Sequence, residues 1–449
     1  MRGPPDSGAP LRILAVSHAY PRSNAPSHGV FVHRLHRAMA LLGHHVEVVQ
    51  RGDWSPPWPF YRFQNALRAS HHERAAFLDD IDGITVHHPL TIRPRPSRFF
   101  TGDSWQREAR SIARYAVRRL RACPFDAVLA HFLVPDGYHA LALGAALGVP
   151  VAAMAWGDDV HAWPARNADW ARRLQHVLRS ADTLIACSER MAGDASRWMA
   201  ERRQDWHVVY GGVDLDRFRP TADRAAARAR VLSPGLTRQL PDTGRIILVL
   251  AQPATAKGYV ELLDVWARLA PSHPDWWLVM AGGPGGDLQI PDEIVKRGPL
   301  PRVVWLGAQP PDRIPDLLAA SDAFVLPSHN EGLSLSVLEA MASGLPTITT
   351  DVGGHAEVIR SSADGWLIAP ADADALANAM SELMTDDAQR RHRGSNARQA
   401  AERIGSPLDN ARRLMAILEQ MVATRHQART VTDNRSGDRA MPLQPLGNA

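Results

Sequence analysis

The sequence has little of what marks secreted, metal-binding or membrane-spanning proteins. Its two cysteines, Cys123 and Cys187, lack the spacing of a metal site and cannot build a disulfide framework, so a reducing compartment is expected. The first ten residues hold no apolar run of the kind found in secretory leaders. The longest apolar run, residues 140–155, is interrupted by glycine and proline and is too short to span a bilayer. We therefore expect a soluble, cytoplasmic protein.

Neither sign of charge dominates the composition. The chain has 51 Lys and Arg against 47 Asp and Glu, which gives a formal net charge of +4 at pH 7. So small an excess is unlike that of a nucleic-acid-binding protein, and no nucleic-acid partner is expected. Contents of 45% hydrophobic and 22% charged residues are ordinary for a globular protein. At 449 residues the chain is too long for one compact core, which favours two domains.

The most informative stretch, residues 320–359, reads as one strand–loop–helix–strand unit. The apolar run 322–326 is typical of a buried parallel strand. A turn-rich loop follows, and Ser334 is the predicted N-cap of a helix over 335–342. The next strand is predicted at 345–349. Such a unit places its central loop at the carboxyl end of a strand, where open α/β sheets bind ligands.

The central loop has the features of an anion site. Gly332, Leu333 and Ser334 lie at a helix N-terminus, where free N–H groups and the helix dipole attract phosphate. Glu331 lies in the same loop, and Glu339 follows it after seven residues. Because phosphate would repel both carboxylates, they are better suited to sugar hydroxyls or to developing positive charge. This combination predicts a nucleotide-sugar site, with one carboxylate on the sugar and the other on the ribose.

These residues resemble the donor-site signature of retaining GT-B glycosyltransferases of family 4, whose hallmark is Glu, seven residues, Glu. The likeness extends through Pro-Ser, Glu-Gly, Glu-Ala-Met-Ala-x-Gly-x-Pro and Asp-Val-Gly-Gly-x-x-Glu within 320–359. An ordinary acidic loop before a core helix is the alternative. The resemblance implies an α/β protein of the GT-B fold: two Rossmann-like domains face each other across a cleft, and a C-terminal helix returns to the first domain.

The resemblance and the alternation of strands and helices predict the domain limits. An acceptor-side Rossmann-like domain precedes a nucleotide-sugar-binding one. The predicted segments are a disordered N-terminus (1–10), the first domain (11–205), the second domain (206–403, with a linker at 217–243), a crossover helix (404–423) and a disordered tail (424–449).

In the first domain, four residues are expected to line the cleft because they follow predicted strands. Gly29 lies in the loop after the first strand; it fits a place near donor or acceptor, although a plain turn glycine would look the same. His131 ends a strand, either touching substrate or serving as a structural strand-end histidine. Trp156 stands where the family often has the histidine of His-Gly-x-Asp, whereas Gly157 and Asp159 keep the pattern.

The second domain departs from the family at two further places. Residues 245–258 resemble Gly-Arg-x-x-x-x-Lys-Gly, with Lys257 and Gly258 in place but Gln252 where arginine is usual. The family arginine and lysine together neutralise the donor diphosphate, and a lost charge-assisted hydrogen bond costs roughly 1.5–3 kcal/mol. Gly211 replaces the asparagine of an Asn-Gly-Val-Asp turn.

Two segments of the first domain are less informative. Residues 51–105 show little periodicity and read as an irregular insertion, a candidate for acceptor contacts. Residues 106–122 are predicted to form a helix that places five arginines on one face. A solvated face is one interpretation; peripheral docking on the inner face of an anionic membrane, or on a lipid diphosphate acceptor, is the other. The arginines are Arg107, Arg110, Arg114, Arg118 and Arg121.

The implied activity is transfer of a sugar from a nucleoside-diphosphate-sugar to a glycan or lipid-linked acceptor with retention, in cell-surface polysaccharide synthesis. Glu331, Lys257 and His131 are the predicted catalytic residues. No cofactor is expected, and no metal, because no Asp-x-Asp ends a strand in the cleft. The predicted donor-binding residues are Gln252, Lys257, Asn330, Glu331, Gly332, Leu333, Ser334 and Glu339.

Other functions remain as alternatives. Departures at Trp156, Gly211 and Gln252 would suit a catalytically weak or inactive GT-B subunit that binds nucleotide-sugar or supports a partner enzyme. A nucleotide-sugar epimerase of the same fold would invert its sugar without an acceptor. A glycosidase is disfavoured because one carboxylate lies in a phosphate-type loop. The glycines at 282–286 do not form Gly-x-Gly-x-x-Gly, so a dinucleotide dehydrogenase is unsupported.

Overall fold

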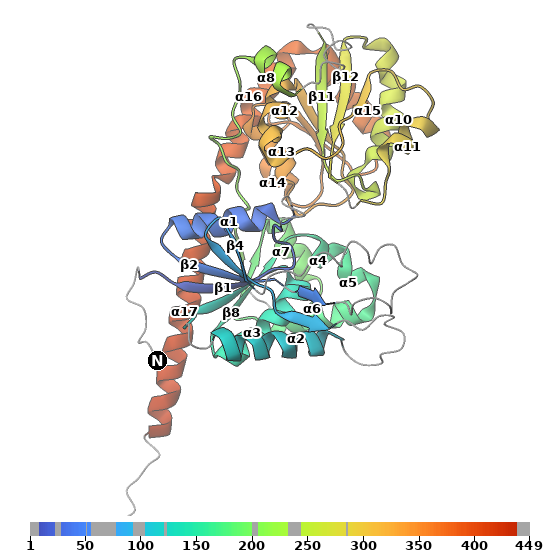
Figure 1. Ribbon diagram of the computed structural model, residues 1–449. Helices are drawn as coiled ribbons and strands as arrows, with labels where there is room; N and C mark the ends of the chain where they lie inside the picture. The colour runs from blue at the N-terminus through green and yellow to red at the C-terminus, as the bar shows by residue number, and fades with distance from the viewer. Residues whose placement is uncertain are drawn as a thin grey trace, which may run out of the picture.

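The structure is a computed structural model (Figure 1). It describes residues 9–22, 28–50, 52–54, 78–92, 104–120, 124–199, 205–231, 244–283 and 286–437. Most of the predicted insertion at 51–105, most of the predicted disordered N-terminus and part of the predicted linker lie outside these residues.

The N-terminal domain is built on an eight-stranded sheet of order β10-β9-β8-β7-β1-β2-β5-β4. All neighbouring strands are parallel except the β4–β5 pair, which is antiparallel. The central strands β1, β7 and β8 are mostly apolar, as expected for strands covered by helices on both faces of the sheet. The strands are β1 (Arg12–Val16), β2 (His45–Val49), β4 (Leu78–Ile81), β5 (Ile84–His87), β7 (Ala127–His131), β8 (Val151–Ala155), β9 (Thr183–Ala186) and β10 (Trp206–Val208). A separate parallel pair joins β3 (Gly52–Trp54) to β6 (Leu90–Ile92).

The helices of this domain alternate with its strands. The first of them, α1, lies on the side of the domain that faces the C-terminal domain (Figure 1). The helical segments are α1 (Val30–Leu41), α2 (Ser104–Tyr115), η4 (Ala116–Leu120), η5 (Leu133–Gly137), α3 (Tyr138–Leu147), α4 (Asp158–His161), α5 (Trp163–Arg166), α6 (Ala168–Ser180) and α7 (Glu189–Ser196).

The C-terminal domain has a six-stranded parallel sheet of order β13-β12-β11-β14-β15-β16. Its strands are β11 (Arg245–Leu250), β12 (Trp276–Ala281), β13 (Val303–Trp305), β14 (Ala323–Leu326), β15 (Thr347–Thr350) and β16 (Trp366–Ile368). Its helical segments are α8 (Arg224–Val231), η6 (Thr255–Lys257), α10 (Tyr259–Leu269), η7 (Ala270–Ser272), α11 (Ile290–Lys296), η8 (Pro311–Arg313), α12 (Ile314–Ala320), α13 (Leu335–Ala342), α14 (His355–Val358), α15 (Ala373–Thr385) and α16 (Asp387–Ile404). The strand–loop–helix–strand unit predicted over 320–359 is therefore present as β14, α13 and β15.

Each domain has a hydrophobic core of its own. One buried cluster draws on residues 213–404 and surrounds the six-stranded sheet. The other draws on residues 11–209 and 411–422 and surrounds the eight-stranded sheet. Two cores around two mostly parallel sheets confirm the predicted α/β architecture of two Rossmann-like domains.

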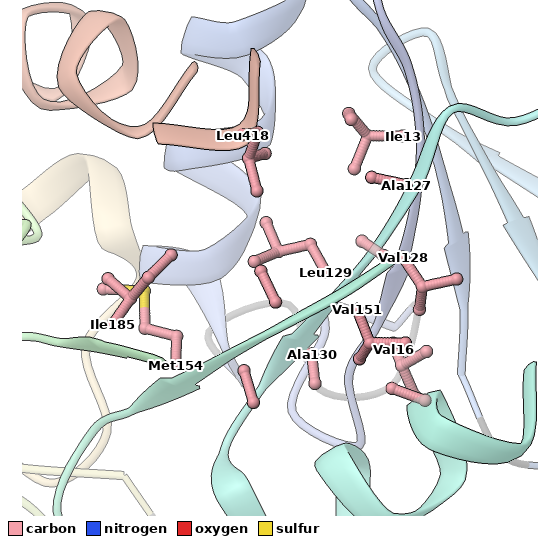
Figure 2. Close-up of a cluster of buried hydrophobic side chains, with 14 of the residues drawn as sticks. Ile13, Val16, Ala127, Val128, Leu129, Ala130, Val151, Met154, Ile185 and Leu418 are labelled. Carbon is pink, nitrogen blue, oxygen red and sulfur yellow. The ribbon is translucent and has the colours of Figure 1, made fainter. Parts of the chain in front are cut away.

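The last helix, α17 (Pro407–Gly437), returns from the C-terminal domain to the N-terminal one (Figure 1). Leu414 and Leu418 are fully buried in the N-terminal core, and Figure 2 shows Leu418 in one cluster with side chains of β1, β7 and β8. The predicted crossover helix is confirmed, but its predicted end was too early. The structure continues the helix through Gly437, where a disordered tail was expected from residue 424, and residues 438–449 are not described.

The basic helix of the N-terminal domain begins two residues earlier than predicted. It consists of α2 followed by the π-helical turn η4, and Arg121 lies outside the described residues. Ile112 and Leu120 are buried in the N-terminal core, and the arginines of α2 and η4 are exposed, as the spacing predicted. Within the described part of the chain, no helix combines the length and the apolar character that crossing a bilayer requires.

Candidate active site

The predicted donor loop, residues 327–334, connects β14 to α13, and the segment 353–355 supports it. The Gly354 N–H donates to the carbonyl oxygen of Gly332 at 2.6 Å. Gly353 has a φ of +50°, and a Cβ there would lie 2.2 Å from the same oxygen. Only glycine permits this approach, which accounts for the Asp-Val-Gly-Gly part of the motif. The two ends of the signature are therefore one packed unit.

His355 supports the start of α13 through a hydrogen bond with the backbone of Ser334. Its Nδ1–H donates to the Thr350 carbonyl oxygen at 3.0 Å, so its Nε2 accepts from the Ser334 N–H at 3.4 Å. Burial lowers the pKa of His355, so the ring is neutral, as this acceptor role requires. One of the three predicted phosphate-binding amides is thus already paired. Within the described residues, the Gly332 and Leu333 N–H groups have no acceptor.

Glu331 and Lys257 form an ion pair in this loop. Lys257 Nζ lies 2.7 Å from Glu331 Oε1, and the Ser328 hydroxyl donates to the same oxygen at 2.9 Å. The lysine side chain is 25% exposed and the glutamate 12%, so the pair is shielded but reachable. Lys257 is the last residue of the short helix η6. The next residue, Gly258, lies so close to the donor loop that a Cβ on it would be 2.1 Å from the Pro327 carbonyl oxygen. The lysine turn therefore packs directly on the donor loop.

Glu339 lies on α13 and is bonded across the domain boundary. Arg34 Nη1, on α1 of the N-terminal domain, donates to Glu339 Oε1 at 2.8 Å. Burial raises the pKa of Glu339, and the Arg34 guanidinium opposes this rise. The sequence predicted the glutamate but not its arginine, because the two residues lie 305 positions apart.

Trp156 joins the N-terminal domain to the donor loop. The centroid of its ring lies 4.7 Å from that of Phe31. Its carbonyl oxygen packs so closely on the donor loop that a Cβ added to Gly332 would lie only 1.7 Å from it. A Cβ on Gly211 would meet the Trp156 ring at 3.6 Å. Two of the three departures from the family pattern therefore lie in the same region, and the space at Gly211 would accommodate a Cβ beside the Trp156 ring.

Asp159 is fully buried and supports two loops. Its carboxylate accepts from the backbone N–H groups of Leu133 at 2.7 Å, Trp156 at 3.1 Å and Gly157 at 2.8 Å. Burial raises the pKa of Asp159 to about 6, although these amides oppose the rise. Asp159, which was predicted to line the cleft, thus links η5 to the turn after β8 by hydrogen bonds. Its side chain has no exposed surface.

His131 is also fully buried and lies behind Trp156. Its Nε2 is 2.8 Å from His36 Nε2, and its ring stacks on Trp156 at 6.1 Å between centroids. Burial lowers the pKa of His131 to about 3, so the ring is neutral. Because it has no exposed surface, His131 makes no catalytic contact in this structure. The structure thus favours the structural interpretation of this histidine.

The remaining predicted residues lie in loops or at helix starts. Gly29 precedes α1 with a φ of +66°, and a Cβ there would lie 2.1 Å from the Ala19 carbonyl oxygen. Glycine is thus required by the turn itself, whatever else the position does. Gln252 is exposed in the loop after β11, and Asn330 is partly exposed beside Glu331.

A second contact between the domains lies at α7. Glu357, on α14, accepts from the N–H groups of Glu189 at 3.0 Å and Arg190 at 2.9 Å, and from the Tyr210 hydroxyl at 2.9 Å. A carboxylate at a helix N-terminus is favourably placed. Arg190 also pairs with Asp351 at 2.7 Å. The glutamate of Gly-Gly-x-x-Glu therefore connects the two domains.

Comparison with known proteins identifies the family. The model for "Glycosyl transferases group 1" matches residues 237–400, and the model for "Glycosyltransferase Family 4" matches residues 28–217. Together they span most of both domains. The chain belongs to the group 1/family 4 glycosyltransferases of the GT-B fold.

Two curated relatives illustrate the range of the family. The chain is 32% identical over 228 residues to D-inositol 3-phosphate glycosyltransferase of Nocardia farcinica, covering 50% of this chain and 49% of that one. It is 25% identical over 375 residues to the putative teichuronic acid biosynthesis glycosyltransferase TuaC of Bacillus subtilis, covering 82% and 88%. The first match thus spans about half the length of the relative.

Solved structures share the fold. Sucrose-phosphate synthase of Thermosynechococcus elongatus superposes with a TM-score of 0.72 at 21% identity, over 92% of this chain and all (100%) of that one. Anabaena HepE in complex with UDP-glucose gives 0.66 at 17% identity, over 91% and 100%.

Proposed function

We propose that this protein transfers a sugar from a nucleoside-diphosphate-sugar to a glycan or lipid-linked acceptor, with retention of configuration and without a metal ion. The observation that carries the proposal is the shielded Lys257–Glu331 pair beside the Gly332 and Leu333 amides. These groups combine a cation and two N–H donors for a diphosphate with a carboxylate for a sugar.

The chemistry requires stabilisation of a departing diphosphate more than a strong base. Lys257 and the amides of Gly332 and Leu333 would bind the phosphates, where fixed donors lower the barrier by stabilising developing negative charge. Glu331 would accept hydroxyl groups of the donor sugar and favour positive charge at its anomeric carbon. Glu339 would accept a ribose hydroxyl. His131 would support the cleft from behind Trp156 and take no part in the reaction.

The acceptor is proposed from relatives. TuaC is named for teichuronic acid biosynthesis, and another relative, LpsB of Rhizobium meliloti, for lipopolysaccharide core biosynthesis. Synthesis of cell-surface polysaccharide in the cytoplasm is the role that we propose for this chain.

Nucleotide binding tests the donor site. We expect calorimetric titration with UDP, GDP and ADP, without added metal, to show one nucleotide binding well above the other two. Lys257 and the two amides would hold its diphosphate despite Gln252, because each charge-assisted hydrogen bond contributes roughly 1.5–3 kcal/mol. Absence of binding by all three would overturn the proposal as stated for the isolated chain.

An inactive subunit is the second candidate, motivated by the departures at Trp156, Gly211 and Gln252. The presence of both signature glutamates, Glu331 and Glu339, weakens it, because loss of activity would be expected to alter these positions too. The intact pair of Lys257 and Glu331 weakens it further. Turnover with any nucleotide-sugar would exclude this candidate.

We also propose peripheral membrane contact through α2 and η4, which expose a row of arginines on the side of the domain opposite the C-terminal domain (Figure 1). Each arginine near an anionic surface contributes about 1 kcal/mol. We expect Arg114→Gln/Arg118→Gln to weaken flotation with phosphatidylglycerol vesicles roughly 30-fold. Arg391→Gln/Arg412→Gln, exposed on other helices, should have little effect. Equal flotation of the two double variants would contradict the membrane contact and would show that the arginine face is a solvated surface.

A further inference from the structure

We propose that Arg34, a residue of the N-terminal domain, is a positioning residue of the donor site. It holds the Glu339 carboxylate charged and oriented so that it accepts a hydrogen bond from the ribose of the bound nucleotide. The inference rests on the proposed function, since it assumes that a nucleotide occupies the loop before α13. Its basis is the 2.8 Å contact between Arg34 Nη1 and Glu339 Oε1.

The contact joins α1 of the N-terminal domain to α13 of the C-terminal domain. Arg34 lies in the second turn of α1, whose start is fixed where Gly29 packs against the Ala19 carbonyl oxygen. The guanidinium lies 5.9 Å from the centroid of the Phe218 ring, which belongs to the C-terminal core. The side chains of Arg34 and Glu339 are only 22% and 11% exposed. Because the pair is shielded from water, removing the arginine would leave the Glu339 carboxylate buried without its partner, which disfavours its charged form.

The geometry leaves one carboxylate oxygen for a ligand. Arg34 occupies Oε1, and within the part of the chain that the structure describes, Oε2 makes no hydrogen bond. Glu339 lies one turn into α13, beyond the Gly332 and Leu333 amides that would bind phosphate. The ribose is attached to the diphosphate, so its hydroxyls would fall near this oxygen. A hydroxyl donates and a carboxylate accepts, so the glutamate must be ionised to bind it well.

The charges around Glu339 make this ionisation depend on Arg34. Burial raises the pKa of Glu339, and Arg34 is the strongest opposing influence; Arg217 also lowers the pKa, whereas Asp214 raises it. Without Arg34, the buried carboxylate would retain only Arg217 against burial and Asp214. Its pKa would then rise further, and more of it would be protonated at a given pH. The affinity of a variant without Arg34 for nucleotide would consequently fall as the pH is lowered, because more of its Glu339 would be protonated.

The test is calorimetric titration of the full chain with the nucleotide that binds best among UDP, GDP and ADP, between about pH 6 and pH 8. We expect Arg34→Gln to weaken binding roughly 10-fold at pH 7, because one charge-assisted contact is lost. The loss should grow toward pH 6 and shrink toward pH 8. Arg37→Gln is the matched control, since Arg37 is exposed on the same helix and bonds the Asp82 backbone oxygen instead.

Two further variants separate positioning from a general structural effect. Arg34→Lys keeps the charge, so it should lose less affinity and retain the pH dependence of the unmodified protein; it also serves if Arg34→Gln does not fold. In a Glu339→Gln background, Arg34→Gln should have little additional effect, because the carboxylate through which it acts is absent.

The outcomes distinguish this inference from the proposed function. If the unmodified protein binds none of the nucleotides, the proposed function fails and this inference falls with it. If it binds and Arg34→Gln binds equally well with the same pH dependence, this inference alone fails. Tighter binding by Arg34→Gln would show that the arginine competes with the ribose for Glu339, which also overturns it.

Discussion

Replacing Glu331 by glutamine is expected to slow sugar transfer strongly while leaving nucleotide binding intact. The carboxylate would act on the donor sugar and on positive charge at its anomeric carbon, so its loss should lower kcat roughly 10²- to 10³-fold. The free nucleoside diphosphate has no sugar to contact. Its affinity should stay level or rise, because Lys257 would lose its 2.7 Å partner and become available to phosphate. Steady-state kinetics and calorimetry on the same preparation measure both effects.

A matched substitution shows whether the effect belongs to this position. The exposed side chain of Glu402 on α16 accepts from Arg398, which keeps its own hydrogen bonds to backbone carbonyl oxygens, so Glu402→Gln should leave transfer and nucleotide affinity within about twofold. If Glu331→Gln lost nucleotide affinity and transfer to the same extent, the carboxylate would be a structural support of the loop. The proposed division between Lys257 on the phosphates and Glu331 on the sugar would then be wrong.

The sequence predicted the fold because its signals are local. Apolar runs bounded by turns mark β14 and β15, and glycine marks the end of α13, so the strand–loop–helix–strand unit could be found from spacing alone. The returning helix was expected from the family resemblance. Its true end was missed because 424–437 is polar, and polar composition does not distinguish a solvated helix from a tail.

The parts of the site that the sequence could not predict are those made by contacts between distant residues. Arg34 reaches Glu339 from another domain, and no spacing along the chain reports such a pair. His355 was visible within Gly-Gly-His, but its acceptor role toward Ser334 depends on how α14 packs under the loop. His131 does end β7, and Asp159 follows β8 in the short helix α4. Both side chains are fully buried, which the order of strands and turns along the sequence does not reveal.

Gly332→Ala is expected to disable the site without unfolding the protein. A Cβ at this position would lie 1.7 Å from the Trp156 carbonyl oxygen, and a backbone atom cannot rotate away as a side chain can. Either the donor loop or the N-terminal domain must therefore move by about 1 Å or more, and displacements of that size cost roughly 10²-fold in rate. We expect kcat/KM to fall by at least about this factor and nucleotide affinity to fall with it. Because each domain has its own core, the circular dichroism spectrum should be unchanged.

The matched control is Gly193→Ala, in the exposed middle of α7, where a Cβ meets no heavy atom within 4 Å. Alanine in a helix is favoured over glycine by roughly 0.5–1 kcal/mol, so this variant should be as active and at least as stable as the unmodified protein. Full activity in Gly332→Ala would mean that the close packing of the donor loop on Trp156 is not needed for transfer.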